Sequence, residues 1–128
     1  MQLTMENTGD ANRIHSYGQG GIVINGTRHE TTTVVTAHTV LTRWGPGSVA
    51  ALGEREIDSL LEMEPELIII GTGSRQLFPS RAFMIRAIEA GIGIEAMTTP
   101  AACRTYNVLI AEQRNAMAVL FGMESTQA

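Results

Sequence analysis

The stretch at residues 66–81, ELIIIGTGSRQLFPSR, constrains the fold of this chain more than any other segment. The four consecutive aliphatic residues at 67–70 predict a short, buried strand. Gly71 and Gly73 predict a tight turn directly after that strand. Loops of this kind begin many nucleotide-binding sites, so the turn is either part of a ligand site or only a turn.

The segments on either side of this stretch predict two different halves. Residues 13–44 favour strands, because β-branched residues crowd positions 31–36. Asn25-Gly26 is a strong hairpin signal, since both residues tolerate positive φ. Trp44, followed by Gly-Pro-Gly, closes this β-rich half. The second half alternates between helical periodicity and short apolar runs, which predict helices at 54–64, 80–91 and 99–114 and strands at 67–71, 92–97 and 115–121.

This order predicts an α/β fold: a compact three-layer single domain with a mixed central sheet, flanking helices and an N-terminal β-hairpin layer. We expect the domain to span residues 13–121, with flexible polar tails at 1–12 and 122–128. The strands near 67–71 and 92–97 should be parallel neighbours joined by the helix at 80–91. The core-facing side of that helix is predicted to be formed by Phe83, Met84, Ala87 and Ile88.

Charge and cysteine content narrow the class of protein. The net charge is −4, and all nine basic residues are arginines without a clustered run. Such a chain is not expected to bind nucleic acid, which requires concentrated positive charge. Cys103 is the only cysteine, which excludes an internal disulfide and fits a reducing compartment. No apolar run is long enough to insert in a membrane, and no signal peptide is apparent. We therefore expect a cytoplasmic protein.

The glycine turn departs from a dinucleotide-binding fingerprint. That fingerprint needs a third glycine, and Gln76 occupies the corresponding position. A weaker anion site has a geometric basis, because loops after parallel strands meet at one edge of a sheet and each loop here leads to a helix N-terminus. The candidate anion-binding residues are Gly71, Thr72, Gly73, Ser74, Arg75, Thr98, Thr99 and Arg104. The alternatives are a turn without a ligand and, for Arg104, a structural ion pair with a buried Glu95.

Cys103 lies in the first turns of the last predicted helix, where a thiolate is somewhat stabilised. A nucleophile also needs a base, and no histidine is near it in sequence. The chain's histidines, His15, His29 and His38, lie in the β-rich half without metal-ligand spacing. We therefore expect Cys103 to be a packed, chemically quiet residue. We assign no catalytic residue, no metal and no cofactor.

Four segments together carry a resemblance to a known family: IHSYGQGGIVINGTRHE, ELIIIGTGSRQLFPS, GIGIEAMTTPAACRTYNVLIAEQR and the alanine-rich final strand. They resemble the domain-of-unknown-function 498 family, which includes mitochondrial complex I assembly factor 3 and an adipogenesis-associated protein. The resemblance covers roughly residues 13–121 and implies the three-layer fold described above. The family's motif positions fall on Gly71, Gly73, Glu95, Thr99, Cys103, Arg104, Thr105, Tyr106 and Asn107.

The resemblance implies no assigned reaction, and it leaves two interpretations of function. The first is a non-enzymatic interaction or assembly-factor-like module with a protein partner. In that case Glu95, Cys103, Tyr106 and Asn107 are structural motif residues. The second is a small-anion-binding protein or an unrecognised enzyme that uses a crevice between the loops at 71–75 and 98–104.

Overall fold

The computed structural model describes residues 11–18 and 21–122. Of the predicted tails, 1–12 and 122–128, residues 1–10 and 123–128 lie outside the described residues. The elements of the five-stranded sheet and its helices are β4 (Thr33–Val35), β5 (Val40–Leu41), η1 (Val49–Ala51), α1 (Glu54–Leu61), β6 (Leu67–Gly71), α2 (Arg81–Glu89), β7 (Gly93–Met97), α3 (Thr99–Ala111) and β8 (Ala116–Leu120). A separate three-stranded sheet contains β1 (Ile14–Gly18), β2 (Gly21–Ile24) and β3 (Thr27–His29).

The central sheet is mixed, with strand order β5-β4-β8-β6-β7. Strand β6 pairs in parallel with β7 on one side and with β8 on the other. Strand β4 is antiparallel to both β8 and β5. The prediction that the strands at 67–71 and 92–97 are parallel neighbours joined by a helix is confirmed. A connection of that length is what parallel strands require.

The three-stranded sheet is antiparallel, in the order β1-β2-β3. Its β2–β3 hairpin turns at Asn25 and Gly26, whose φ angles are 49° and 87°. Two successive positive φ angles suit the right-handed twist of the flanking strands, and they explain the Asn-Gly pair. The predicted hairpin is therefore confirmed. Trp44, at the end of the β-rich half, donates its backbone N–H to Thr32 O at 3.1 Å.

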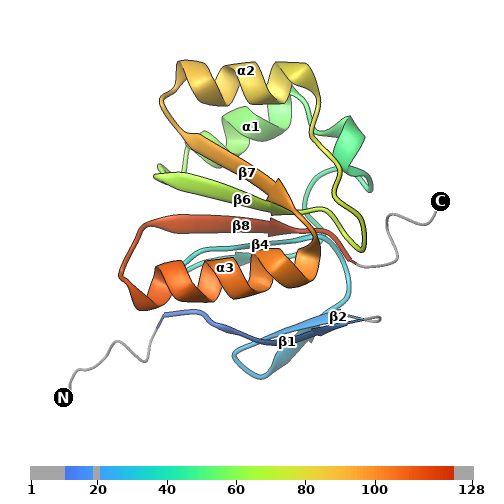
Figure 1. The fold of residues 1–128 in the computed structure, drawn as a ribbon, viewed down its shortest axis with the longest axis vertical. Helices are drawn as coiled ribbons and strands as arrows, with labels where there is room; N and C mark the ends of the chain where they lie inside the picture. The colour runs from blue at the N-terminus through green and yellow to red at the C-terminus, as the bar shows by residue number, and fades with distance from the viewer. Residues whose placement is uncertain (1–10, 19–20, 123–128) are drawn as a thin grey trace.

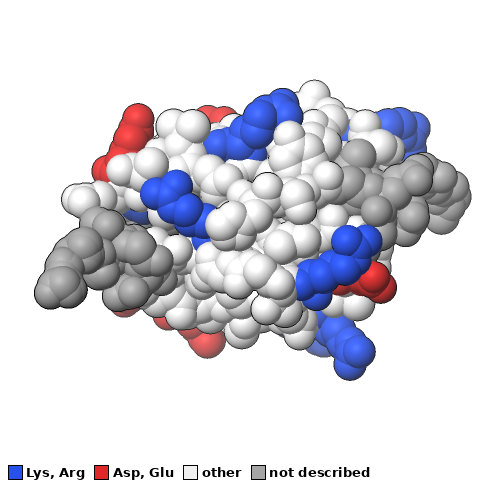
Figure 2. Space-filling view, turned by 90° about the horizontal axis from the view of Figure 1, so that it is seen from below, with Lys and Arg blue, Asp and Glu red and all other residues white. Residues whose placement is uncertain are grey.

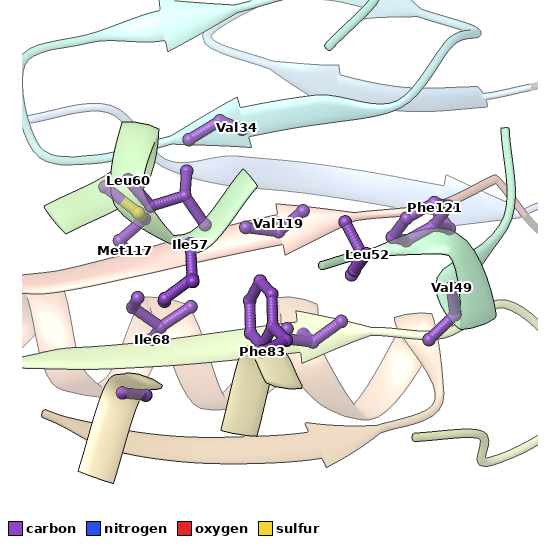
Figure 3. Packing of buried hydrophobic residues seen from close by; sticks show 12 residues of the cluster. Val34, Val49, Leu52, Ile57, Leu60, Ile68, Phe83, Met117, Val119 and Phe121 are labelled. Atoms are coloured by element: carbon purple, nitrogen blue, oxygen red, sulfur yellow. The ribbon is translucent and has the colours of Figure 1, made fainter. Parts of the chain in front are cut away.

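The elements form layers around the central sheet (Figure 1). Helices α1 and α2 cover one face, and α3 lies on the other face with β1 and β2 beyond it. The α1/α2 side encloses a core of buried apolar residues, shown close up in Figure 3: Val34, Val49, Leu52, Ile57, Leu60, Ile68, Ile70, Phe83, Ala87, Met117, Val119 and Phe121. The α3 side encloses a second core that joins it to the small sheet: Ile14, Ile22, Ile24, Val35, Ile69, Ala102, Cys103, Tyr106, Ile110, Ala118 and Leu120. The predicted fold class is confirmed.

Local signals set the ends of α2. The Ser80 side chain accepts a hydrogen bond from the Phe83 N–H at 3.2 Å and caps the first turn. Gly91, with φ 77°, follows the last turn. The predicted core face of this helix is wrong at Ile88, which is 72% exposed. Phe83 and Ala87 form the buried stripe, and Ile88 lies 100° further round the helix, on the solvent side.

Among the described residues, no helix is long and apolar enough to cross a membrane.

Asn12 belongs to the predicted N-terminal tail, but it forms hydrogen bonds with the folded domain. Its N–H donates to Ala37 O at 2.8 Å, and its Nδ2 donates to Thr36 O at 2.9 Å.

Candidate functional site

The glycine turn after β6 is joined directly to the start of α3. The Thr72 N–H donates to Met97 O at 2.8 Å, which continues the β6–β7 pairing beyond the ends of the strands. Gly73 and Thr99 then exchange two bonds. The Thr99 N–H donates to Gly73 O at 2.8 Å, and the Gly73 N–H donates to Thr99 Oγ1 at 2.8 Å. The Thr99 hydroxyl in turn donates to Phe121 O at 2.7 Å, so it links the turn to the end of β8.

A second threonine organises the interior of the turn. Thr72 is fully buried, and its Oγ1 lies 2.6 Å from Arg75 O and 3.1 Å from Met97 O, the two acceptors available to its hydroxyl proton. The same oxygen accepts the Leu77 N–H at 3.1 Å. A side chain that satisfies backbone groups two to five residues away is the usual device that stabilises such a turn.

Gly71 and Gly73 are each required in the turn, for different structural reasons. A Cβ on Gly71 would lie 3.0 Å from Thr99 Cα and 3.1 Å from Ala102 Cβ, because α3 passes directly over this point. Gly73 has φ 96°, a conformation that a residue with a side chain rarely adopts. The tight turn predicted at these positions is present, and close approach and backbone freedom account for both glycines without a ligand.

The structure brings most of the predicted anion-binding residues together. Gly71 and Gly73 lie against Thr99 at the carboxyl edge of the parallel strands, and Thr72 bonds to Met97 there. Within the described chain, the N–H groups of Thr72, Gly73 and Thr99 already have protein acceptors. Ser74 and Arg75 are exposed, so their side chains are the parts of the turn that face solvent. Binding of an anion at this place stays a prediction.

Arg104 and Glu95 do not form the expected buried pair. Arg104 is exposed, and its guanidinium donates to the Tyr17 hydroxyl of β1 at 2.9 Å. Glu95 is also exposed. Its register partner is Ile69, so it shares the α3 face of the sheet. However, β7 is an edge strand, and α3 lies mainly over β6 and β8. The prediction that Glu95 is buried is therefore wrong, because α3 leaves that position of the edge strand exposed.

The residues after Cys103 hold the small sheet on α3. The Tyr106 hydroxyl donates to Asn12 O at 2.9 Å. Asn107 Nδ2 donates to Ile14 O at 2.7 Å, and Asn107 Oδ1 accepts the Ile14 N–H at 3.0 Å. Tyr106 and Asn107 therefore have a structural role, as the first interpretation expected, but the sequence did not reveal their partners. The signal in the sequence is a pair of polar residues on a mainly apolar helix face. The backbone groups that they bind lie more than 90 residues away, so the sequence alone does not identify them.

Burial keeps two side chains of the motif, Cys103 and Tyr106, in their neutral forms. Cys103 is 1% exposed, and desolvation raises the pKa of its thiol to about 12, against a smaller opposing effect of Arg104. Burial likewise raises the pKa of the Tyr106 phenol above its ordinary value, although the nearby Arg13 partly offsets this. A nucleophilic thiolate is therefore absent at neutral pH, as expected for a packed cysteine.

Charges on the surface are dispersed. Figure 2 shows the face on which the small sheet lies, and its arginine side chains stand apart with uncharged residues between them. The described ion pairs join Arg28 to Glu30 at 3.1 Å, and Arg86 to Asp58 at 2.9 Å and to Glu54 at 4.0 Å. In the part of the chain that the structure describes, no group of three or more His, Cys, Asp or Glu side chains is placed to hold a metal ion.

Residues 14–121 match a family model described as a protein of unknown function, DUF498/DUF598. The chain is 33% identical over 72 residues to the 13 kDa major membrane protein of Francisella tularensis subsp. holarctica (strain LVS), a match that covers 56% of this chain and 58% of that one. It is 30% identical over 116 residues to human NADH dehydrogenase [ubiquinone] 1 alpha subcomplex assembly factor 3, covering 89% of this chain and 62% of the relative. The chain thus spans about three fifths of each curated relative's length.

The fold is also that of solved structures. An NMR structure of a Xanthomonas campestris protein aligns with a TM-score of 0.83 and 29% identity, over 96% of this chain and 93% of that one. The similarity to the family that the sequence motifs predicted is therefore confirmed over residues 14–121.

Proposed function

The chain belongs to the family of unknown function DUF498/DUF598, and on that premise we propose that it is a non-enzymatic interaction module that binds a protein partner during assembly of a larger complex. A human relative that matches 89% of this chain is named an assembly factor. Assembly factors work by binding subunits, which requires a surface and no reacting groups. The internally bonded glycine turn and the protonated Cys103 support the same choice.

The observation that carries this proposal is an apolar surface on α2. Ile85 and Ile88 lie one helical turn apart and are 41% and 72% exposed. A hollow of about 480 Å³ is lined by Ile85 and Ala82 and by the charged residues Glu54, Arg81, Arg86 and Glu89. An apolar centre with a charged rim is the usual anatomy of a protein interface. We call this region, residues 81–89, the α2 surface, and we propose that the partner binds there.

The test is capture of partners from the native host, followed by mass spectrometry and titration of the purified partner. The double variant Ile85→Ser/Ile88→Ser should lower the affinity for that partner at least tenfold, because it removes the apolar centre. Val108→Ser is the matched control, since Val108 is 56% exposed on a different helix. Equal affinity of the wild type and the double variant would contradict the placement of the interface on the α2 surface.

The alternative function is binding of a small anion, or an unrecognised reaction, at the loops 71–75 and 98–104. The exposed Ser74 and Arg75 beside the first turn of α3 favour it. Against it stand the internal hydrogen bonds of Thr72, Gly73 and Thr99, because a ligand would have to replace them.

We place this activity in the cytoplasm, on the basis of the single unpaired cysteine. A Francisella relative carries the name of a membrane protein, so the location needs its own test. Fractionation of host cells that express the tagged chain should recover it with the cytoplasmic marker. Recovery with the membrane fraction after a salt wash would contradict this location.

A further inference from the structure

A second hollow lies at the end of the sheet opposite the glycine turn. It has a volume of about 400 Å³ and is formed where the start of β1, the β4–β5 connection and the segment after α3 meet. Its apolar walls include Ala37 and Ile110, and the polar residues that line it are Arg13, His38, Gln113, Arg114 and Asn115. Hollows of this volume are in the range that small ligands occupy.

The charge of this hollow is one-sided. Arg13 and Arg114 both line it, and none of the described residues that line it is an aspartate or a glutamate. In the described parts of the chain neither guanidinium has an ion pair, whereas Arg28 and Arg86 do. Two guanidinium groups that share a concave site without a carboxylate form a region of positive potential.

The two arginines are held in place by their backbones. The Arg13 N–H donates to Asn25 Oδ1 at 3.0 Å, in the hairpin turn of the small sheet. The Arg114 N–H donates to Leu109 O at 2.9 Å and so caps the last turn of α3. That bond and the Gln113 N–H donation to Ile110 O at 2.9 Å occupy carbonyl groups whose negative end would otherwise repel an anion.

We propose that this hollow binds a small organic anion, in which a carboxylate or phosphate group is attached to a short apolar body. The planar guanidinium fork matches both oxyanions. His38 offers a ring nitrogen for a further hydrogen bond. Ala37 and Ile110 provide the apolar contact for the body of the ligand. This site is distinct from the loops at 71–75 and 98–104, and it does not depend on the proposed interaction role.

The test is an NMR titration of the ¹⁵N-labelled full chain at constant ionic strength, with benzoate, phenyl phosphate and the uncharged analogue benzamide as probes. Benzoate or phenyl phosphate should produce saturable amide shifts at residues 37–38 and 113–115, and benzamide should not. Arg13→Gln and Arg114→Gln should each weaken binding about tenfold. Arg55→Gln, at an exposed arginine on α1, removes the same charge elsewhere and should leave the affinity unchanged.

The ¹⁵N spectrum of each variant serves as the check that it is folded. Preference for phenyl phosphate over benzoate, or the reverse, would identify which oxyanion the hollow takes. Shifts confined to residues 71–75 and 98–104 would overturn this inference. An equal loss of affinity in Arg55→Gln would also overturn it, because binding would then depend on overall charge. If neither anion shifts residues 37–38 and 113–115 at 10 mM, the inference is also overturned, because such a titration detects dissociation constants in roughly the millimolar range.

Discussion

The side-chain amide of Asn107 and the backbone of Ile14, 93 residues apart, exchange two hydrogen bonds. Nδ2 donates to Ile14 O at 2.7 Å, and Oδ1 accepts the Ile14 N–H at 3.0 Å. Strand β1 is an edge of the small sheet, so these backbone groups face outward without a strand partner. The amide of α3 therefore takes the place of a neighbouring strand. This geometry explains why an asparagine follows Tyr106 in the motif.

Asn107→Ala should lower the free energy of unfolding by about 1–3 kcal/mol, because it leaves a partly buried N–H and C=O of Ile14 unpaired. Guanidinium unfolding followed by circular dichroism would measure this loss. Val108→Ala at the exposed neighbouring position is the control and should change stability by less than about 0.5 kcal/mol. A loss for Asn107→Ala as small as that of the control would mean that water satisfies Ile14 equally well.

The parts of the fold that could be predicted from sequence are those whose cause is local. Asn25-Gly26 specifies its own turn, Ser80 and Gly91 mark the ends of α2, and the aliphatic run of β6 indicates a central strand. The errors arise where the cause is distant. Glu95 is in a strand as predicted, but its exposure depends on α3 passing over β6 and β8 instead of β7.

The same reasoning applies to the candidate sites. The sequence could place Gly71 and Thr99 at one edge of the sheet, because loops after parallel strands meet there. It could not show that the Gly73 N–H donates a hydrogen bond to the Thr99 hydroxyl oxygen. Nor could it bring Arg13 beside Arg114, since that depends on how the small sheet packs on α3.

Gly71→Ala should destabilise the protein by about 1–3 kcal/mol, the usual cost of adding a methyl group to a filled core. The new Cβ would lie 3.0 Å from the Thr99 Cα, and backbone can move only if α3 shifts on the sheet. Gly47→Ala is the control, because its Cβ would have no atom within 4 Å. Thermal unfolding of both variants measures the difference. Equal midpoints would show that α3 shifts without cost.

Thr99→Val should cost about 2–4 kcal/mol, since valine keeps the shape but leaves the Gly73 N–H and Phe121 O without their hydroxyl partner. Thr98→Val is the matched control, because the Thr98 side chain makes no capping hydrogen bond. Denaturant unfolding of the two variants should give a loss below about 0.5 kcal/mol for the control. Similar values for both would show that the Thr99 hydroxyl does not stabilise the turn.

Cys103 gives a prediction about alkaline pH. Its thiol has a raised pKa of about 12 in the folded state, against an ordinary value of 9.0, so the folded chain holds this proton more tightly than the unfolded chain does. The resulting stability is fully present below pH 9 and is lost as the pH rises toward 12. The stability difference between the wild type and Cys103→Ala should therefore shrink by about 1.4 kcal/mol between pH 7.5 and pH 10.

Guanidinium unfolding of both proteins at the two pH values measures this change. At pH 7.5 the native wild type should also react slowly with a thiol reagent and react quickly only after unfolding. Fast stoichiometric labelling of the native protein would show a thiolate and would contradict the quiet role of Cys103.

The glycine turn should bind small anions weakly and should not bind a dinucleotide. The side chains of Ser74 and Arg75 are exposed, and one guanidinium fork beside a helix start supports roughly millimolar affinity, about −4 kcal/mol. An NMR titration should therefore show phosphate and citrate shifting residues 71–75 and 98–104, with the shifts lost in Arg75→Ala and kept in Arg81→Ala.

NAD should produce no stronger effect than phosphate, because Gln76 replaces the third glycine of a dinucleotide site and the N–H of Gly73 is already donated to Thr99. Saturable micromolar binding of NAD would contradict this prediction and would support the enzymatic alternative. If none of the three ligands produces shifts, the motif has only a structural role, in which the turn connects β6, α3 and the end of β8 through hydrogen bonds.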